Sequence, residues 1–241
     1  METNRGNYPR PIPESKVKYL TKLASKSVCI VETEENVGSA GFYVFEATSG
    51  TRFCLISCHH VLSPEQVLTA TFQVKGYNKF SLKKDWIGQI SFKPKLLGDF
   101  TVVELMSKAI NILKKIGVTF LRVSETQTGD QFIIIQYLNM ELCLGQGSIL
   151  AITGFSFEYY APTDYGSSGS PLLRWSGEAI GVHRGRSSLL YEQGIGPKKV
   201  ATCLTKIIRY FLHETQQPMY SLFLICKTAT SHFRQLMSDY L

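Results

Sequence analysis

Short apolar runs follow one another from residue 27 to residue 183 of the chain. They are rich in Val, Ile, Phe and Tyr and are separated by turn formers such as Ser49-Gly50. Runs of this length, bounded by such residues, predict β-strands. The predicted strands form two groups, 27–33, 40–47, 52–58, 68–74, 85–92 and 100–105, followed by 131–137, 147–153, 155–161, 170–174 and 179–183.

The pattern changes between the two groups and again after them. Residues 106–123 have the character of a helical or irregular connector. In residues 200–212 the apolar side chains recur at helical spacing, which predicts an amphipathic helix. Residues 217–241 form a further tail, to which we assign no role. Many short strands in two groups predict an all-β fold, built as two β-barrels or as a sandwich.

Composition is consistent with a folded protein of ordinary character. The chain has 241 residues, of which 44% are hydrophobic and 19% charged. No apolar run reaches the roughly 18 residues that a membrane span needs, so we expect no membrane partner. The first twenty residues are polar, contain three prolines and lack the apolar stretch of a signal peptide. We therefore expect an intracellular protein, cytoplasmic or nuclear.

The six cysteines do not indicate a metal site. Five of them sit inside apolar runs, as Cys29 and Cys143 do, and their spacing matches no zinc pattern. Without an export signal, we interpret them as reduced thiols of the core rather than as disulfide partners. We expect no cofactor and no metal.

The formal charge of +7 leaves several partners open. Basic residues occur in pairs, such as Lys83-Lys84 and Lys114-Lys115. Such a charge can favour an acidic substrate, nucleic acid or an anionic surface, although a solvated basic face is the simpler interpretation. No nucleic-acid-binding motif is recognisable, so nucleic acid is not our expected partner.

The run Gly166-Ser167-Ser168-Gly169-Ser170-Pro171 has the composition of an ordinary loop, but it also suits a nucleophile. Its glycines permit unusual backbone angles. A turn of this kind can aim the N–H groups of Gly166 and Ser168 at one point, where an oxyanion would form. Of the three serines, only Ser168 has glycine both two residues before it and one residue after it, so we predict Ser168 as the nucleophile.

Acyl transfer by serine also needs a base and an acid that orients it. A buried strand ends in His59-His60-Val61, and His60 is the predicted base, with His59 as the alternative. Asp99 stands directly before an apolar strand and is the predicted acid. Asp85 and Asp130 are weaker alternatives, because neither opens an equally buried strand.

The order His, Asp, Ser, together with the hairpin that precedes His60, resembles the trypsin-like serine proteases of chymotrypsin fold. The resemblance spans residues 25–212 and implies two six-stranded antiparallel β-barrels with a C-terminal helix and an extra tail. It implies a serine endopeptidase that acts on protein or peptide substrates through His60, Asp99 and Ser168. The implied organisation is an N-terminal extension at 1–24, a first barrel at 25–106, a connector at 107–130, a second barrel at 131–199, and the helix and tail at 200–241.

Two features place the chain within this resemblance. Pancreatic enzymes carry Asp directly before the nucleophile to pair with a newly cut N-terminus. Here that position is Ser167, so this activation switch cannot operate. The run from Gly177 to Gly185 resembles glutamyl endopeptidases and viral chymotrypsin-like proteases, in which Thr and His, here Thr163 and His183, serve the specificity pocket.

The resemblance implies cleavage after Glu or Gln. Because the chain also resembles intracellular serine proteases that prefer aromatic residues, such residues stay an alternative. Arg184 and Arg186 are expected to bind substrate, by pairing with a substrate carboxylate, with partial blocking of the pocket and a solvent-facing position as the alternatives. Two other functions stay open at this stage, a catalytically silent binding module of protease fold and a basic nucleic-acid-associated protein. The oligomeric state is not predicted.

Overall fold

A helix that the sequence pattern did not indicate opens the described part of the chain. The computed structural model describes residues 13–138, 140–186 and 198–216. Helix α1 (Glu14–Ser27) begins directly after Pro13, a residue that suits a helix start, and its buried side chains are Leu20, Ala24 and Ser27. Polar residues dominate the rest of this helix, so it lacks a wide apolar stripe. Part of the predicted N-terminal extension is therefore helical.

The first unit is an antiparallel sheet with one parallel addition. Its strands lie in the order β4-β1-β2-β3-β6-β5, and β7 pairs in parallel with β2. The prediction gave six strands, and it missed β7, which is too short for a periodic signal. The strands are β1 (Val28–Glu32), β2 (Val37–Ala47), β3 (Gly50–Ser57), β4 (Thr71–Val74), β5 (Ile87–Lys93), β6 (Phe100–Leu105) and β7 (Leu121–Arg122).

Short helices join these strands and begin the connector to the second unit. Three single turns, η1 (Pro64–Gln66), η2 (Lys84–Trp86) and η3 (Lys95–Leu97), lie between strands of the sheet. Helix α2 (Ser107–Lys115) follows β6 and buries Ala109 and Leu113. The connector is thus partly helical, as the sequence predicts.

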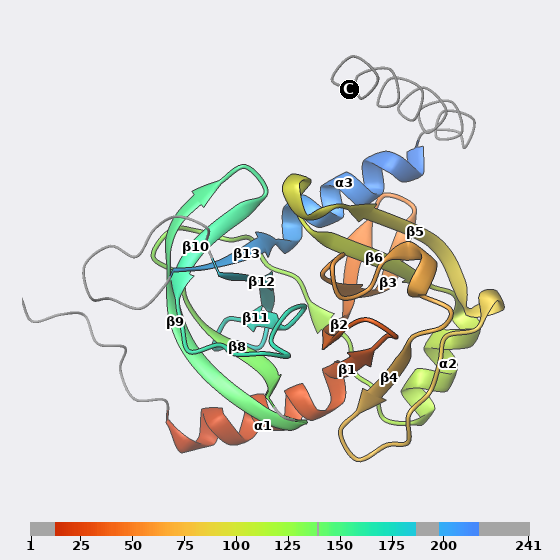
Figure 1. The fold of residues 1–241 in the computed structure, drawn as a ribbon, viewed down its shortest axis with the longest axis horizontal. Coiled ribbons are helices and arrows are strands. Elements are labelled where there is room, and N and C mark those ends of the chain that lie inside the picture. The colour runs from red at the N-terminus through yellow and green to blue at the C-terminus, as the bar shows by residue number, and fades with distance from the viewer. Residues whose placement is uncertain (1–12, 139, 187–197, 217–241) are drawn as a thin grey trace, which may run out of the picture.

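The second unit is a closed, six-stranded antiparallel barrel, as the resemblance implies, and its strands lie in the order β10-β13-β12-β11-β8-β9. Figure 1 shows the two units side by side, with α1 running below them and α3 (Leu204–Gln216) above. The barrel strands are β8 (Gln131–Leu138), β9 (Glu141–Thr153), β10 (Ser156–Tyr160), β11 (Pro171–Leu173), β12 (Ala179–Arg186) and β13 (Lys199–Cys203).

The predicted helix at 200–212 is wrong at its start. Residues 200–203 belong to β13, and α3 begins only at Leu204. The strand lies between β10 and β12, so its backbone N–H and C=O groups close the barrel. A short strand followed at once by a helix leaves no turn residue in the sequence, which is why the helical spacing was extended too far.

Strand β8 divides the core between the two units. Its residues alternate between the barrel interior and the seam with the first unit, as strand geometry requires. Phe132 and Ile134 pack inside the barrel with Phe157. Ile133 and Ile135 pack in the larger cluster, which also holds the core of the first unit and side chains of α1 and α3. Both faces of β8 are therefore buried, and the seam between the units is a hydrophobic core.

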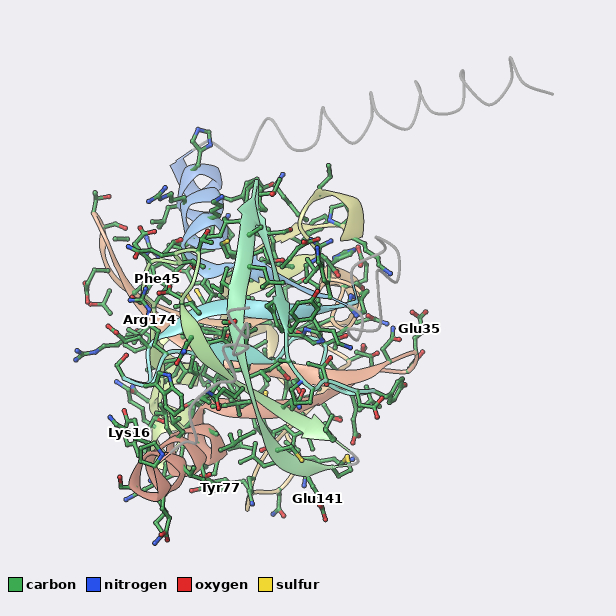
Figure 2. The ribbon with its side chains drawn as sticks, turned by 90° about the vertical axis from the view of Figure 1, so that its left-hand side faces the viewer. Lys16, Glu35, Phe45, Tyr77, Glu141 and Arg174 are labelled. Carbon is green, nitrogen blue, oxygen red and sulfur yellow. The ribbon has the colours of Figure 1, made fainter. Side chains whose placement is uncertain are left out.

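Most charged side chains lie at the surface of the protein. Figure 2 shows Lys16, Glu35 and Glu141 at the outer edges of the molecule, and all three are exposed.

No helix among the described residues is long and apolar enough to cross a membrane. The five cysteines within the described residues are free thiols, four of them buried and Cys143 half-buried, while Cys226 lies outside the described residues.

Helix α1 contributes to stability through one apolar anchor. Leu20 is fully buried in the cluster that joins the two units. We expect Leu20→Ala to lower the free energy of unfolding by about 2 to 5 kcal/mol, since it leaves a cavity in a packed core. Lys22 is exposed on the same helix, and Lys22→Ala should change stability by less than about 0.5 kcal/mol. Urea unfolding of both variants tests this, and equal losses would contradict it.

Candidate active site

The loop that carries Ser168 is clamped onto strand β2 of the first unit. The N–H of Ser39 donates to the Ser168 carbonyl at 2.7 Å, and the Ser39 hydroxyl donates to the Gly166 carbonyl at 3.0 Å. Gly166 and Gly169 have φ values of 91° and 87°, which favour glycine. The second unit thus supplies the loop, and the first unit fixes its position.

Gly169 is required for this contact as well as for the turn. A Cβ placed on Gly169 would lie 1.8 Å from the Ser39 carbonyl oxygen, which is far inside van der Waals contact. The same oxygen accepts a hydrogen bond from the Ser57 hydroxyl at 2.7 Å, so it is held on the other side. No side chain fits between the loop and β2 without separating them.

Ser167 closes the loop on itself. Its side chain is buried, and its hydroxyl donates to the Asp164 carbonyl at 2.6 Å and accepts from the Asp164 N–H at 3.0 Å. These are local bonds to the backbone three residues earlier. The residue in the position of the pancreatic Asp therefore supports the loop without any charged partner.

Two backbone donors of the loop are left open. The N–H groups of Ser167, Gly169 and Ser170 bind carbonyls of Asp164, His183 and Ser167. The N–H groups of Gly166 and Ser168, by contrast, have no acceptor within the described part of the chain. Because backbone N–H groups are rarely left without a partner, this predicted pair of donors is available to an oxyanion.

His60 is bound twice to Asp99. The ring Nδ1 lies 2.7 Å from Asp99 Oδ2, and the backbone N–H of His60 donates to Oδ1 at 3.1 Å. The carboxylate is only 1% exposed, whereas His60 is half-buried. Asp99 has a φ of 54°, a left-handed conformation that is uncommon for a residue other than glycine. The structure therefore brings these two predicted residues together.

The pKa of Asp99 reflects this environment. Burial alone raises the pKa of the carboxyl group, but the hydrogen bonds from His60 and the charges of His60 and Arg184 outweigh that effect. The net result is a pKa below the ordinary value of 3.8. Asp99 is consequently a carboxylate at neutral pH, able to hold the imidazole by its Nδ1–H.

The nucleophile loop and the turn after His60 both pack against Gly38 of β2. A Cβ placed on Gly38 would lie 2.6 Å from Val61 Cγ1 and 2.9 Å from the Ser168 carbonyl oxygen, so the turn after His60 and the nucleophile loop pack on the same residue. The Ser168 hydroxyl donates to the Arg184 carbonyl at 3.4 Å. Catalytic hydrogen bonds are often unformed without substrate, and rotation about χ1 redirects this hydroxyl.

The alternative residues lie in other environments. The ring of His59 stacks on Phe92 at 5.3 Å between centroids and lies 3.5 Å from the Thr101 hydroxyl. Asp85 pairs with Lys108, and Asp130 pairs with Arg174. None of these three residues contacts the nucleophile loop in the hydrogen bonds of the described chain.

His183 is buried beside the nucleophile loop. Its ring Nδ1 lies 2.5 Å from the Tyr159 hydroxyl, and its backbone binds Ser170 and Gly169. Burial, first, and then the charges of Lys199 and His60 lower the pKa of His183 to about 3. The imidazole is therefore neutral at physiological pH.

The other predicted pocket residues are placed differently. Thr163 is half-buried just before the loop, and within the described residues the ring partner of His183 is Tyr159, not Thr163. The guanidinium of Arg184 donates hydrogen bonds to the Ser156 hydroxyl and the Lys95 carbonyl. Arg186 ends β12 opposite Lys199, and its side chain lies outside the described structure.

Two residues near the site were not predicted. Tyr159 was missed because the sequence of its strand shows only alternating side chains. That pattern does not indicate which neighbouring strand Tyr159 contacts. Cys58 lies two residues before His60, and its thiol donates to the His183 carbonyl at 2.9 Å. Ligand atoms of Cys58, His60 and Asp99 lie within 4.8 Å of one another. Burial, followed by the charge of Asp99, raises the pKa of the Cys58 thiol well above its usual value, so the thiol is protonated.

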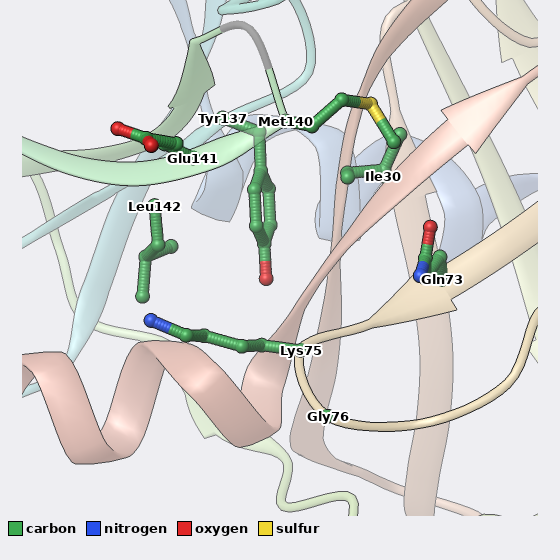
Figure 3. A pocket seen from close by; sticks show the side chains of 8 residues that line it. All are labelled: Ile30, Gln73, Lys75, Gly76, Tyr137, Met140, Glu141 and Leu142. Atoms are coloured by element: carbon green, nitrogen blue, oxygen red, sulfur yellow. The ribbon is translucent and has the colours of Figure 1, made fainter.

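A cavity of about 430 Å³ lies elsewhere on the seam. Figure 3 shows the ring of Tyr137 at the centre, with Leu142 on one side, Lys75 below it, and Met140, Ile30 and Gln73 on the other side. Its lining includes neither His60, Asp99 nor Ser168. It is therefore separate from the site described above.

The sheet unit, which carries His60 and Asp99, and the closed barrel, which carries Ser168, together have the chymotrypsin fold of the serine endopeptidases, which are hydrolases. The model of one family, the trypsin-like peptidase domain, matches residues 38–182, more than half of the chain. The chain belongs to this family. The matched segment contains all three residues and ends directly before His183. No curated protein matches the chain at significance.

Solved structures agree on the fold. The inactive form of the Rv3671c protease of M. tuberculosis H37Rv is 14% identical, with a TM-score of 0.61, over 87% of this chain and 97% of that chain. The serine protease domain of the Sesbania mosaic virus polyprotein is 18% identical, with a TM-score of 0.54, over 77% of this chain and 91% of that chain. At this identity the likeness concerns the fold.

The neutral, buried state of His183 predicts a loss of stability in mild acid. In the unfolded chain a histidine binds a proton near pH 6.5, whereas folded His183 does so only near pH 3. Between these values the unfolded state holds more protons, so the free energy of unfolding falls as the pH falls. Asp99 adds a loss in the same direction, but only below its ordinary pKa of 3.8.

Urea unfolding at pH 6.5 and pH 4.5 measures this effect. Between these values the wild-type protein should lose on the order of 2 kcal/mol more than His183→Gln, because the variant has no proton to gain at this position. Equal losses in the two proteins would show that His183 is not the group responsible.

Proposed function

We propose that this serine endopeptidase acts through His60, Asp99 and Ser168 and cleaves after Glu, with Gln as the second preference. The observation that carries the triad is the double attachment of His60 to a buried carboxylate, at 2.7 Å through the ring and 3.1 Å through the backbone. This attachment fixes the ring orientation and leaves Nε2 as the basic nitrogen.

The reaction follows from these groups. Ser168 Oγ attacks the carbonyl carbon of the scissile bond while its proton passes to His60 Nε2. The N–H groups of Gly166 and Ser168 bind the oxyanion of the tetrahedral intermediate. The C–N bond then breaks, and His60 returns the proton to the leaving amine. Water, deprotonated by the same His60, hydrolyses the acyl-enzyme and restores the Ser168 hydroxyl.

The pocket preference rests on the tautomer of His183. Burial raises the pKa of Tyr159 well above its usual value, so its hydroxyl keeps its proton. That hydroxyl has His183 Nδ1 as its partner, at 2.5 Å. We assign the tyrosine as the donor to Nδ1, which places the ring proton of the neutral histidine on Nε2. An N–H donor in this place suits a side-chain carbonyl or carboxylate oxygen.

Lys199 favours Glu over Gln. Lys199 is 7% exposed and pairs with Tyr159 across β10 and β13, so the two residues lie on the same face of the barrel wall. Its charge is close enough to His183 to help lower the pKa of that histidine. A cation beside a neutral donor stabilises a substrate carboxylate more than a substrate amide.

Covalent labelling separates the proposed enzyme from a silent binding module of the same fold. A fluorophosphonate probe should label the wild-type protein and should fail to label Ser168→Ala, because the probe reacts with an activated serine hydroxyl. Ser176→Ala makes the same change at an exposed serine and should label normally. Intact-mass spectrometry counts the adducts. A wild-type protein that is not labelled would refute the proposed chemistry.

A peptide library that varies the residue before the cut tests the pocket. We expect kcat/KM to be highest for Glu, followed by Gln. Tyr159→Phe should lower the preference for Glu over Ala by about tenfold, since it removes one hydrogen bond to a buried partner. Tyr160→Phe is the control on the neighbouring residue. A profile dominated by Lys, Arg or small residues would overturn the proposed preference, and one dominated by aromatic residues would support the alternative.

A further inference from the structure

The guanidinium of Arg184 lies beside Asp99 and is bound by protein groups. Arg184 follows His183 on β12, and its side chain is 19% exposed. One terminal nitrogen donates to the Ser156 hydroxyl at 2.8 Å and the other to the Lys95 carbonyl at 2.7 Å. Its Nε lies 3.8 Å from Asp99 Oδ2. All three guanidinium nitrogens therefore face the protein.

The Arg184 guanidinium and the His60 ring share one oxygen. Asp99 Oδ2 lies 2.7 Å from His60 Nδ1 and 3.8 Å from Arg184 Nε. The other carboxylate oxygen accepts the His60 backbone N–H. Oδ2 of the carboxylate thus has two neighbours, an imidazole and a permanent cation. Since Asp99 is buried, solvent screens the attraction between its carboxylate and the Arg184 guanidinium only weakly.

A bulge in β12 directs Arg184 to this position. The pairing of β12 with β13 shifts between His183 and Gly185, so Arg184 has no partner in the register. A bulge of this kind changes the direction of the side chain that it carries. The neighbouring residues keep their pairing with Ala201 and Val200.

The same contacts tie the second unit to the turn that carries Asp99. Lys95 begins η3, four residues before Asp99, and its carbonyl accepts the Arg184 bond. The Thr202 hydroxyl on β13 donates to the Gly98 carbonyl at 2.6 Å. Two barrel strands thereby hold the segment on which Asp99 adopts its left-handed φ of 54°.

We propose that Arg184 is a positioning residue of the triad, which fixes the Asp99 carboxylate against His60 and offsets part of its negative charge. This inference rests on the proposed catalytic role of His60, Asp99 and Ser168. Arg184 itself touches no reacting atom through its side chain. Its effect on the reaction passes through Asp99 to His60.

The direction of the effect on His60 follows from the charges around it. The groups that face His60 are Asp99 from the turn before β6, Arg184 and His183 from β12, and Cys58 and His59 from its own segment. His183 and Cys58 are neutral at physiological pH. A carboxylate favours the imidazolium, and a nearby cation opposes it. Loss of the Arg184 charge should therefore move the acidic limb of the pH–rate profile to higher pH.

The rate of fluorophosphonate labelling from pH 5 to pH 9 tests this, because it needs no peptide substrate. In Arg184→Gln the midpoint of the acidic limb should move upward by on the order of 0.5 to 1 pH unit, and the plateau rate should fall at least tenfold. Arg184→Lys should restore the midpoint toward the wild-type value. Ser156→Ala keeps the charge but removes one anchor, so it should lower the plateau without moving the midpoint.

Arg209→Gln is the matched control, since Arg209 is exposed and pairs only with Glu125 in the described structure. Circular dichroism confirms that each variant is folded. A wild-type midpoint in folded Arg184→Gln would overturn the inference while leaving the triad intact. If Arg184→Gln does not fold, a wild-type plateau in Ser156→Ala and a shifted midpoint in Arg184→Lys would overturn it. No labelling of the wild-type protein would instead overturn the proposed function, and this inference with it.

Discussion

The contact between the nucleophile loop and strand β2 is the constraint on which the site depends. Ser39 binds the Ser168 and Gly166 carbonyls, and its own carbonyl leaves no room for a Cβ on Gly169. The loop belongs to the closed barrel, whereas Ser39 belongs to the first sheet. The hydrophobic seam brings the two units together, and these contacts fix the position of the loop against β2.

Electrostatics across the seam complete the arrangement. The first unit contributes a buried carboxylate, which would be unfavourable alone. His60 satisfies it from within the same unit, and Arg184 approaches it from the second unit. The neutral His183 and the protonated thiol of Cys58 add no further charge. The Asp99 carboxylate therefore interacts with both the His60 imidazole and the Arg184 guanidinium.

Much of this could be read from the sequence, and the failures have physical causes. Short apolar runs with turn residues between them predicted the two strand groups, and the order of His60, Asp99 and Ser168 pointed to residues that the fold brings to one seam. The position of Arg184 could not be predicted, because it depends on a bulge in one strand pair. The bond from Tyr159 to His183 depends on strand order within the barrel, and neither pattern nor spacing encodes that order. Helix α1 was not predicted because it lacks a wide apolar stripe. The start of α3 was placed too early because β13 leads into α3 without a turn residue.

The close fit at Gly38 and Gly169 has a mechanical meaning. Both glycines sit where one unit touches the other, and neither site has space for a single extra carbon. A change in spacing between the sheet and the barrel at these two glycines would move the Ser168 loop relative to the His60 turn without altering either side chain. The relative position of Ser168 and His60 therefore depends on how closely the two units pack against each other.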